Sequence, residues 1–110
     1  MNENVKEYLD RYSVELNELY AQIRDIIYDS VPQEIEEKLW AKIPSYYVGD
    51  SFVRLIPFKN HINIEASAIA LHIGKLDDYK TTPKGMLQVY IGQTIPSYIL
   101  KQIFAETLDR

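Results

Sequence analysis

The chain contains no cysteine among its 110 residues. This absence excludes disulfide bonds, thiolate zinc sites, cysteine-ligated iron–sulfur clusters and cysteine nucleophiles. The first ten residues are charged and do not form the apolar run of a signal peptide. No segment approaches the roughly 20 apolar residues that a membrane-spanning helix needs. We therefore expect a cytoplasmic protein that folds without disulfides and does not associate with membranes.

Motifs for catalysis are also missing. The two histidines, His61 and His72, are not part of a histidine-rich metal motif. The chain has no glycine-rich nucleotide fingerprint and no serine, histidine and aspartate in a context typical of hydrolases. Carboxylates are plentiful, but no pattern places two of them in one cleft for acid–base chemistry. The sequence therefore favours a non-enzymatic role and leaves a paired-carboxylate enzyme as the alternative.

Acidic residues are concentrated in the first third of the chain. Residues 1–37 hold ten Asp and Glu against three Lys and Arg, whereas residues 38–84 hold four against seven. The net charge of −4 argues against non-specific nucleic-acid binding, which depends on cations that neutralise phosphates. The length, with 46% apolar and 25% charged residues, fits one globular domain over residues 1–110.

Helical periodicity is strongest at the two ends of the chain. Apolar residues spaced alternately by three and four predict a long helix over residues 4–30, which Pro32 ends. Residues 34–40 are predicted to form a second, shorter helix. Another short helix is expected to begin at Ser67, with this serine as its N-cap, and Pro96 suits the first position of a last helix. The apolar stripe of the last helix consists of Ile99, Leu100, Ile103, Phe104 and Leu108.

The middle of the chain changes to the two-residue period of strands. Strands are predicted at residues 46–48, 52–58 and 61–66, with two-residue turns at 49–50 and 59–60. A turn of two residues at 59–60 fixes which residues of the second hairpin lie opposite each other. The expected cross-strand pairs are Phe58 with His61, Ile56 with Asn63, and Arg54 with Glu65.

These elements predict an α+β fold. A last strand is expected at residues 86–91, with Leu87, Val89 and Ile91 directed to the core. The N- and C-terminal helices are expected to pack on one face of a largely antiparallel sheet, which leaves the other face uncovered. Aromatic and polar groups side by side on such a face suit a ligand or a partner. The residues predicted on the uncovered face are Phe52, Arg54, Ile56, Phe58, His61, Asn63, Glu65, Gln88 and Tyr90.

Several segments resemble the YdhG-like family of small bacterial proteins. They are Phe58-Lys59-Asn60-His61-Ile62, Tyr79-Lys80-Thr81, Lys84-Gly85-Met86-Leu87-Gln88, Ile95-Pro96, Leu39-Trp40 and Pro44-Ser45-Tyr46. Members of that family have a frataxin-like fold, so the resemblance implies a two-layer sandwich of helices on an antiparallel sheet. One branch is described as an iron chaperone. The resemblance therefore implies transient iron binding and partners from iron–sulfur or haem assembly.

Carboxylates on the outer side of the predicted first helix are the candidates for iron. Oxygen ligands suit hard cations and ferrous iron, and a weak site would allow the ion to be passed on. The alternative is a solvated helix face that keeps the protein soluble, in which Glu7 pairs with Arg11 one turn later. The candidate metal residues are Glu3, Glu7, Asp10, Glu18, Asp25 and Asp29.

The uncovered sheet face gives a second hypothesis, a module that binds a small molecule or an anion. A histidine there could contact a ligand, or it could fix the turn. The basic loop at residues 75–85 could bind an anion through ammonium and N–H groups, or it could be solvated, and its spacing is not that of a P-loop. The candidate ligand residues are His61, Lys80, Lys84, Gln88 and Tyr90. A third hypothesis is a plain protein-interaction domain, and the same face could serve a homodimer.

Overall fold

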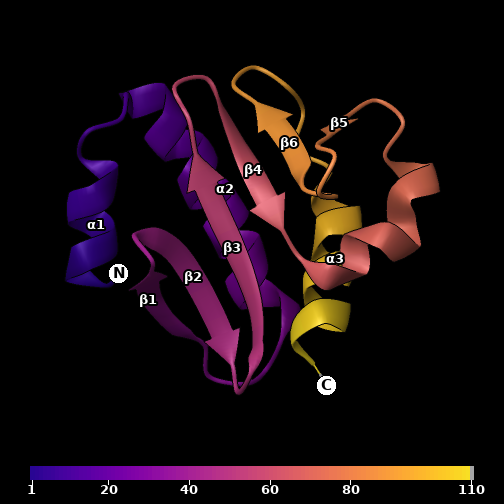
Figure 1. The fold of residues 1–110 in the computed structure, drawn as a ribbon, viewed down its shortest axis with the longest axis horizontal. Coiled ribbons are helices and arrows are strands. Elements are labelled where there is room, and N and C mark those ends of the chain that lie inside the picture. The colour runs from indigo at the N-terminus through magenta and orange to yellow at the C-terminus, as the bar shows by residue number, and fades with distance from the viewer. Residues whose placement is uncertain (110) are drawn as a thin grey trace.

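A computed structural model describes residues 1–109 and has an α+β fold. Its six-stranded sheet is antiparallel throughout, with the order β1-β2-β3-β4-β6-β5 (Figure 1). The strands are β1 (Glu36–Trp40), β2 (Ile43–Val48), β3 (Ser51–Pro57), β4 (His61–Glu65), β5 (Lys80–Thr81) and β6 (Leu87–Tyr90). The helices are α1 (Glu3–Leu9), α2 (Val14–Ser30), the 3₁₀ helix η1 (Ser67–Lys75) and α3 (Ser97–Leu108). The predicted fold class is confirmed.

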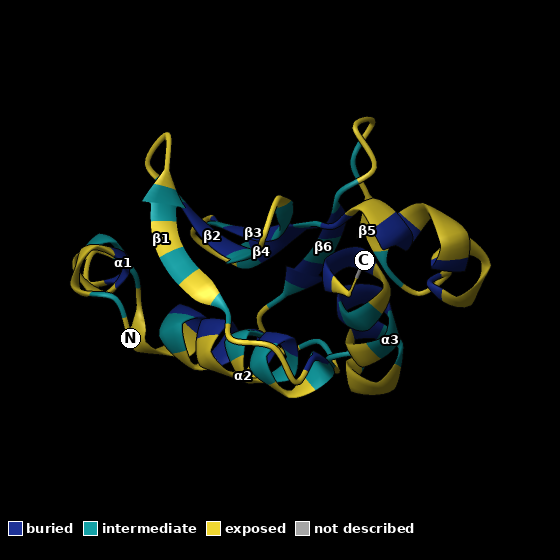
Figure 2. Ribbon diagram, turned by 90° about the horizontal axis from the view of Figure 1, so that it is seen from below, coloured by how far each residue is buried: buried dark blue, intermediate teal, exposed yellow. Residues whose placement is uncertain are grey.

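Helices α2 and α3 cover one face of the sheet and pack against each other (Figure 2). Helix α1 lies beside edge strand β1. No helix of the described residues lies on the opposite face, as Figure 2 shows. The expected packing of helices on a single face is therefore present. Within residues 1–109, no helix has the length and apolar character needed to cross a bilayer.

The hydrophobic core lies between the helices and the covered face of the sheet. On β3 and β4 it contains Val53, Leu55, Ile62 and Ile64, all with no exposed surface. Every second residue along these strands points to the core, as strand geometry requires. The main fully buried residues from the helices are Val5, Leu16, Tyr20, Ile23, Ile27, Leu100, Ile103 and Phe104. The apolar stripe predicted for the last helix is thus confirmed, with Ile99 only partly buried.

The N-terminal helical region differs from the prediction of one long helix. The chain forms two helices, because Ser13 caps α2 by accepting a hydrogen bond from the Leu16 N–H at 3.1 Å. Asp10 ends α1. Buried residues Leu9 and Leu16 keep the apolar spacing across this break, so the stripe continues although the helix does not. Periodicity alone could not reveal the interruption.

The predicted short helix over residues 34–40 is wrong, because β1 occupies this segment. Strand β1 pairs with β2, which begins at Ile43 and not at residue 46. Ala41 and Lys42 join them with φ angles of 49° and 67°. A two-residue turn with positive φ at both positions matches the twist of a hairpin. Pairing with β2 therefore outweighs the helical preference of the β1 residues.

The hairpin between β3 and β4 has the predicted register. Arg54 lies opposite Glu65, and Ile56 lies opposite Asn63. The Phe58 N–H donates to the His61 carbonyl at 2.8 Å, which closes the turn. The predicted contacts across this hairpin are confirmed.

Three smaller expectations near the other elements need correction. Ile91 was expected in the core but is 37% exposed, because β6 ends at Tyr90 and Ile91 belongs to the following turn. Ser67 does not cap η1, whose N-cap is Ala66 without a side-chain hydrogen bond. Pro96 is the N-cap of α3, so that helix begins one residue later, at Ser97.

Candidate docking surface on the open sheet face

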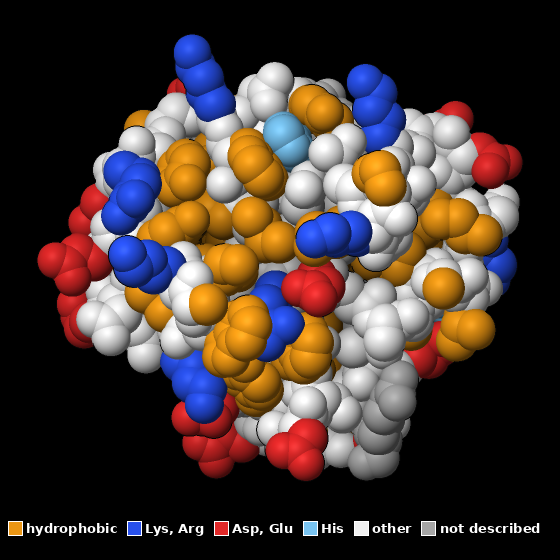
Figure 3. Space-filling model, viewed as in Figure 1, with side chains coloured by type: hydrophobic (Ala, Val, Ile, Leu, Met, Phe, Trp, Pro, Cys, Tyr) orange, Lys and Arg blue, Asp and Glu red, His pale blue; other side chains and the backbone are white. Residues whose placement is uncertain are grey.

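The uncovered side of the sheet, called here the open sheet face, carries side chains from all its strands. Figure 3 shows apolar side chains gathered over the strands, with Lys and Arg side chains around and among them. Trp40 and Phe58 keep 51% and 42% of their surfaces exposed. By register, the open sheet face consists of Glu36, Lys38, Trp40, Ile43, Ser45, Tyr47, Phe52, Arg54, Ile56, Phe58, His61, Asn63, Glu65, Lys80, Gln88 and Tyr90.

Arg54 occupies the middle of this face between two aromatic rings. The centre of its guanidinium group lies 4.0 Å from the Trp40 ring centroid and 3.7 Å from that of Phe52. These distances are those of cation–π contacts. The rings come from β1 and β3, so the contacts link the edge of the sheet to its centre.

Hydrogen bonds fix the orientation of the Arg54 guanidinium group. Its Nε–H donates to Ser45 Oγ at 3.1 Å, and Nη2–H donates to the Tyr47 hydroxyl at 3.1 Å. On the other side, Nη1 lies 3.6 Å from Glu65 Oε1. That distance allows ionic attraction but is too long for a good hydrogen bond. The Arg54 side chain is only 9% exposed, whereas that of Glu65 is 38% exposed.

A second group on the open sheet face is a row of stacked rings. The His61 imidazole lies between Phe58 and Tyr90, with ring centroids 4.6 Å away on each side. The interplanar angles are 7° and 24°. The spacing matches the distance between neighbouring strands, because the rings come from adjacent strand ends. The Lys80 ammonium group lies 5.6 Å from the Tyr90 centroid and continues the row.

His61 is held as part of this row. Burial between the rings lowers the pKa of His61, and hydrogen bonding to Asn63 opposes the shift only in part. Its Nδ1 also lies 2.8 Å from Asn60 Oδ1. The neutral imidazole is therefore favoured near pH 7. A neutral ring between two aromatic rings acts as a packing element more than as a source of charge.

The structure brings together most of the predicted ligand residues. Lys80 lies opposite Gln88, and His61 lies opposite Tyr90. Gln88 Nε2–H donates to Asn63 Oδ1 at 3.2 Å, so its amide is engaged within the sheet. Lys84 is separate from this group, since it lines a pocket at the other end of the face.

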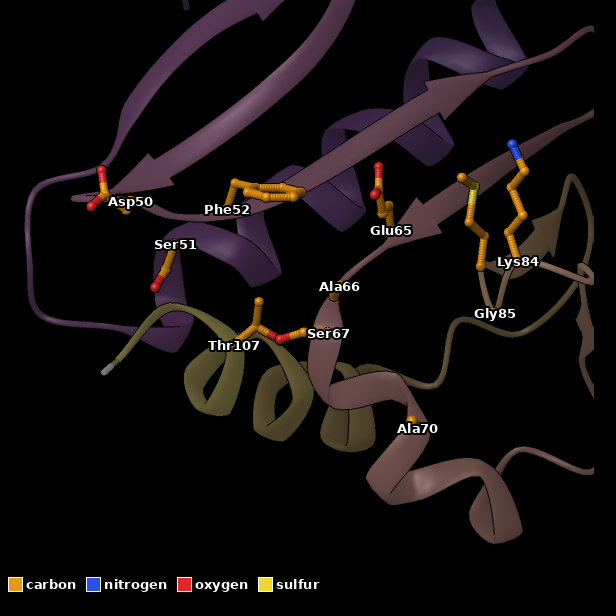
Figure 4. A pocket seen from close by; sticks show the side chains of 11 residues that line it. Asp50, Ser51, Phe52, Glu65, Ala66, Ser67, Ala70, Lys84, Gly85 and Thr107 are labelled. Carbon is orange, nitrogen blue, oxygen red and sulfur yellow. The ribbon is translucent and has the colours of Figure 1, made fainter.

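That pocket has a volume of about 420 Å³ and lies between the sheet, η1 and the loop that precedes β6. Figure 4 shows Glu65 and Lys84 projecting in the same direction, with Phe52 farther along the sheet. Ser67 and Thr107 lie on the helical side. The volume is in the range of small-molecule sites, but the pocket is open on one side.

Lysines surround the open sheet face. Lys42 and Lys59 lie in its hairpin turns, and Lys84 lies in the loop before β6. Among residues 1–109, these three lysines and Lys80 form no ion pair with a carboxylate. These four lysines, called here the lysine rim, outnumber the three carboxylates of the face and its turns, which are Glu36, Glu65 and Asp50.

The carboxylates predicted to bind iron are spread over several places. Glu3, Glu7 and Asp10 line one shallow hollow on α1, which they share with Lys6. Glu18 lines a different hollow, together with Glu15 of the same helix. Asp25 and Asp29 lie farther along α2 and are exposed. In the part of the chain that the structure describes, no group of three or more His, Cys, Asp and Glu could hold a metal ion. Iron handling stays a prediction that rests on the family resemblance.

Sequence reasoning missed residues on β1 and β2. Trp40 was assigned to a helix, and Ser45 lay just before the strand predicted at residues 46–48. The alternation of Ile43, Ser45 and Tyr47 is the signal that extends this strand backwards. Extending it would have placed the partners of Arg54 on the same face.

No protein-family model matches the chain, and neither the curated proteins nor the solved structures include a match to it. The resemblance to the YdhG-like family therefore stays a prediction. Any function has to be argued from the geometry of the molecule.

Proposed function

We propose that the chain is a non-enzymatic domain that binds an acidic protein partner on its open sheet face. The observation that carries this proposal is the contrast in coverage of the sheet. Helices α2 and α3 cover one face, whereas the other presents large, partly exposed side chains such as Trp40 and Phe58. Exposed apolar patches bordered by polar residues are typical of interaction sites.

The composition of the face fits a protein partner better than a small molecule. Trp, Tyr, Phe and Arg are the residues most enriched at protein interfaces. The face presents Trp40, Tyr47, Phe52, Arg54 and Tyr90 over several strands. The pocket of about 420 Å³ lies at an end of the face, away from the stacked rings. A small ligand would leave most of this surface uncovered.

The arrangement of the rings disfavours single-stranded nucleic acid. Base recognition on a sheet uses aromatic rings whose flat faces are free for stacking. Here His61 is stacked on both sides, and Arg54 takes a face of both Trp40 and Phe52. Several of the ring faces that bases would need are therefore already occupied by side chains of this domain.

Charge indicates an acidic partner. The lysine rim of the open sheet face attracts carboxylates, and complementary charge directs association. The same rim opposes a symmetric homodimer through this face, because the two rims would meet with equal sign. Six of the 16 acidic residues of this chain lie on α1 and α2, and α2 packs on the other side of the sheet.

The edges of the sheet are poor sites for strand addition. Edge strand β1 is flanked by α1, and Asn2 Nδ2–H donates to the Glu37 carbonyl at 3.1 Å. The other edge strand, β5, has two residues. Short or covered edges resist pairing with another chain. Docking on the face is the remaining mode for the sheet.

Photo-crosslinking in cells tests the proposal. A photoreactive amino acid is placed at Trp40 or Phe58 on the face, and at Tyr98 or Leu71 as controls. Both controls are 77% exposed apolar residues on helices α3 and η1. We expect the same acidic protein to crosslink from both face positions and from neither control. Crosslinking that is equal from all four positions, or absent from the face, would contradict the proposal.

Calorimetry with the purified partner then measures how much the open sheet face contributes to the binding affinity. Trp40→Ala should weaken binding by at least about tenfold, since buried tryptophans dominate interface energies. Tyr98→Ala is the matched control and should leave the affinity unchanged within about twofold. An unchanged affinity of the Trp40 variant would show that the partner docks elsewhere.

A further inference from the structure

We infer that Arg54 forms a receptor for one carboxylate, which an acidic side chain of the docked partner occupies. This inference rests on the proposed function, because it names the chemistry of the partner at the centre of the open sheet face. It starts from an incomplete set of hydrogen bonds around a nearly buried charge.

The guanidinium group of Arg54 has more donors than acceptors around it. Its Nε–H and one N–H of Nη2 are bonded to Ser45 and Tyr47. Among the described residues, the N–H groups of Nη1 have no hydrogen-bond partner, and Glu65 is 3.6 Å away. An arginine side chain carries several N–H donors and no acceptor. The free donors therefore lie on one side of the group.

The guanidinium group is also fixed in place. The Trp40 and Phe52 rings both pack against the guanidinium group, and the bonds to Ser45 and Tyr47 set its rotation. A planar guanidinium group binds a carboxylate through parallel N–H donors. Because Arg54 is already ordered, binding an anion would cost little conformational entropy.

A partner that covers the face has to satisfy these donors. Covering would remove the water that now reaches the 9% exposed Arg54 side chain. Buried donors without acceptors are unfavourable, and the ion pair with Glu65 at 3.6 Å leaves the Nη1 donors without a hydrogen bond. Glu65 lines the pocket at the end of the face and forms no hydrogen bond with Arg54. An acidic side chain from the partner supplies the missing acceptor.

The neighbouring Glu65 favours a monoanion over a dianion. A phosphate would bring about two negative charges close to the Glu65 carboxylate, and like charges repel. A carboxylate brings one charge and matches the guanidinium geometry. The receptor therefore fits an Asp or Glu side chain better than a phosphorylated residue.

An NMR titration tests the receptor on the chain alone. The probe is glutamate blocked at both termini, and the control is blocked glutamine of the same shape. We expect blocked glutamate to shift the Arg54 Nε–H signal saturably in the millimolar range, and blocked glutamine to leave it unchanged. Equal shifts with both compounds would overturn the inference, as would no shift with either. Tighter binding of inorganic phosphate than of blocked glutamate, at equal ionic strength, would overturn the inference and indicate a phosphate site.

Substitutions distinguish a receptor from a purely structural arginine. Glu65→Gln removes the competing carboxylate and should tighten binding of blocked glutamate by about threefold, given the modest strength of a partly exposed ion pair. Arg54→Lys should abolish the saturable shift, followed on backbone amides. Asp25→Asn, an exposed change on α2, removes one negative charge as Glu65→Gln does and should leave the affinity unchanged. Unchanged or weaker binding in Glu65→Gln would contradict the receptor even if Arg54→Lys fails to fold.

The two proposals fail in different ways. Crosslinking restricted to the face, together with no carboxylate binding, would leave the docking surface and remove the receptor. Carboxylate binding without any crosslinking from the face would remove the protein partner and leave an anion site.

Discussion

On strand β3, Val53 and Leu55 point toward the helices and are fully buried, whereas Arg54 and Ile56 point to the opposite face. The covered face is apolar and closed by α2 and α3. The open sheet face has no second layer, and its large side chains pack on one another. Arg54 lies between two rings, and His61 lies between two others. The comparison teaches that the same strands build a closed core on one side and leave large side chains at the surface on the other.

The largest expected effect comes from the covered face. Leu55→Ala should lower the free energy of unfolding by about 3 kcal/mol, because it removes fully buried methyl groups and leaves a cavity. Ile56→Ala, its neighbour on the open sheet face, should cost about 1 kcal/mol or less. Urea denaturation of both variants measures the difference. Equal losses would show that the open sheet face is packed like a core.

An ion pair at the end of the covered side gives the next effect. The side chain of Glu37 is 5% exposed and binds Arg24 Nε at 2.6 Å. Glu37→Gln should cost about 2 kcal/mol at pH 7, since a hydrogen bond between charged groups is lost. Lys38→Gln, which breaks an exposed pair with Glu36 on the open sheet face, should cost less than about 0.5 kcal/mol.

The dependence of stability on acidic pH should reveal the same ion pair between Arg24 and Glu37. Burial raises the pKa of Glu37, but hydrogen bonds from Arg24, the Asn2 N–H and Tyr46 outweigh it, so the pKa lies below its ordinary value of 4.5. Its stabilisation is therefore present above pH 4.5 and is lost as the pH falls through the folded-state value. Thermal unfolding between pH 7 and about pH 3 should show a steeper loss for the wild type than for Glu37→Gln. Parallel curves would contradict this assignment.

Trp40 should contribute little to stability and much to binding. Trp40→Ala removes a cation–π contact with Arg54 and should cost about 1 kcal/mol. The chain has one tryptophan, so acrylamide quenching of its fluorescence reports the open sheet face directly. We expect efficient quenching in the free chain at every protein concentration. Protection that grows with concentration would instead indicate self-association through this face.

The smallest effect is the titration of His61. Because burial lowers its folded-state pKa, the unfolded chain takes up the proton first as the pH falls below 6.5. Stability should therefore decrease slightly as the pH falls from 6.5 toward the folded-state value. His61→Phe keeps a ring between Phe58 and Tyr90 and should flatten this slope in denaturation curves. An unchanged slope would show that His61 is not responsible.

The hairpin between β3 and β4 could be predicted because two independent signals agree. The turn at residues 59–60 and the alternation of side chains give the same register. The alternation in the last predicted strand placed Gln88 and Tyr90 on the same face as His61, and the structure pairs His61 with Tyr90. Elements whose local pattern and tertiary pairing point to one structure are the predictable ones.

Other elements depend on information that the local sequence does not carry. The apolar stripe continues across Ser13, so the break between α1 and α2 is invisible to periodicity. Residues 34–40 are rich in Glu, Lys and Leu, which favour helix, yet they pair with β2. Assigning residues 34–40 to a helix hid Trp40, and starting the next strand at residue 46 hid Ser45, so two of the contacts of Arg54 were missed. The site was therefore predictable on β4 and β6 but not on β1 and β2.

One measurement tests the central claim, that the open sheet face is the docking surface. Trp40 is replaced by 5-fluorotryptophan. Its fluorine NMR signal is followed while the purified partner, identified by the crosslinking experiment, is added. We predict a saturable shift and loss of the solvent-isotope effect on this signal, because Trp40 becomes covered. The same label introduced through Tyr98→Trp in a Trp40→Phe background should remain exposed. A Trp40 signal that stays unchanged at saturating partner would contradict the account.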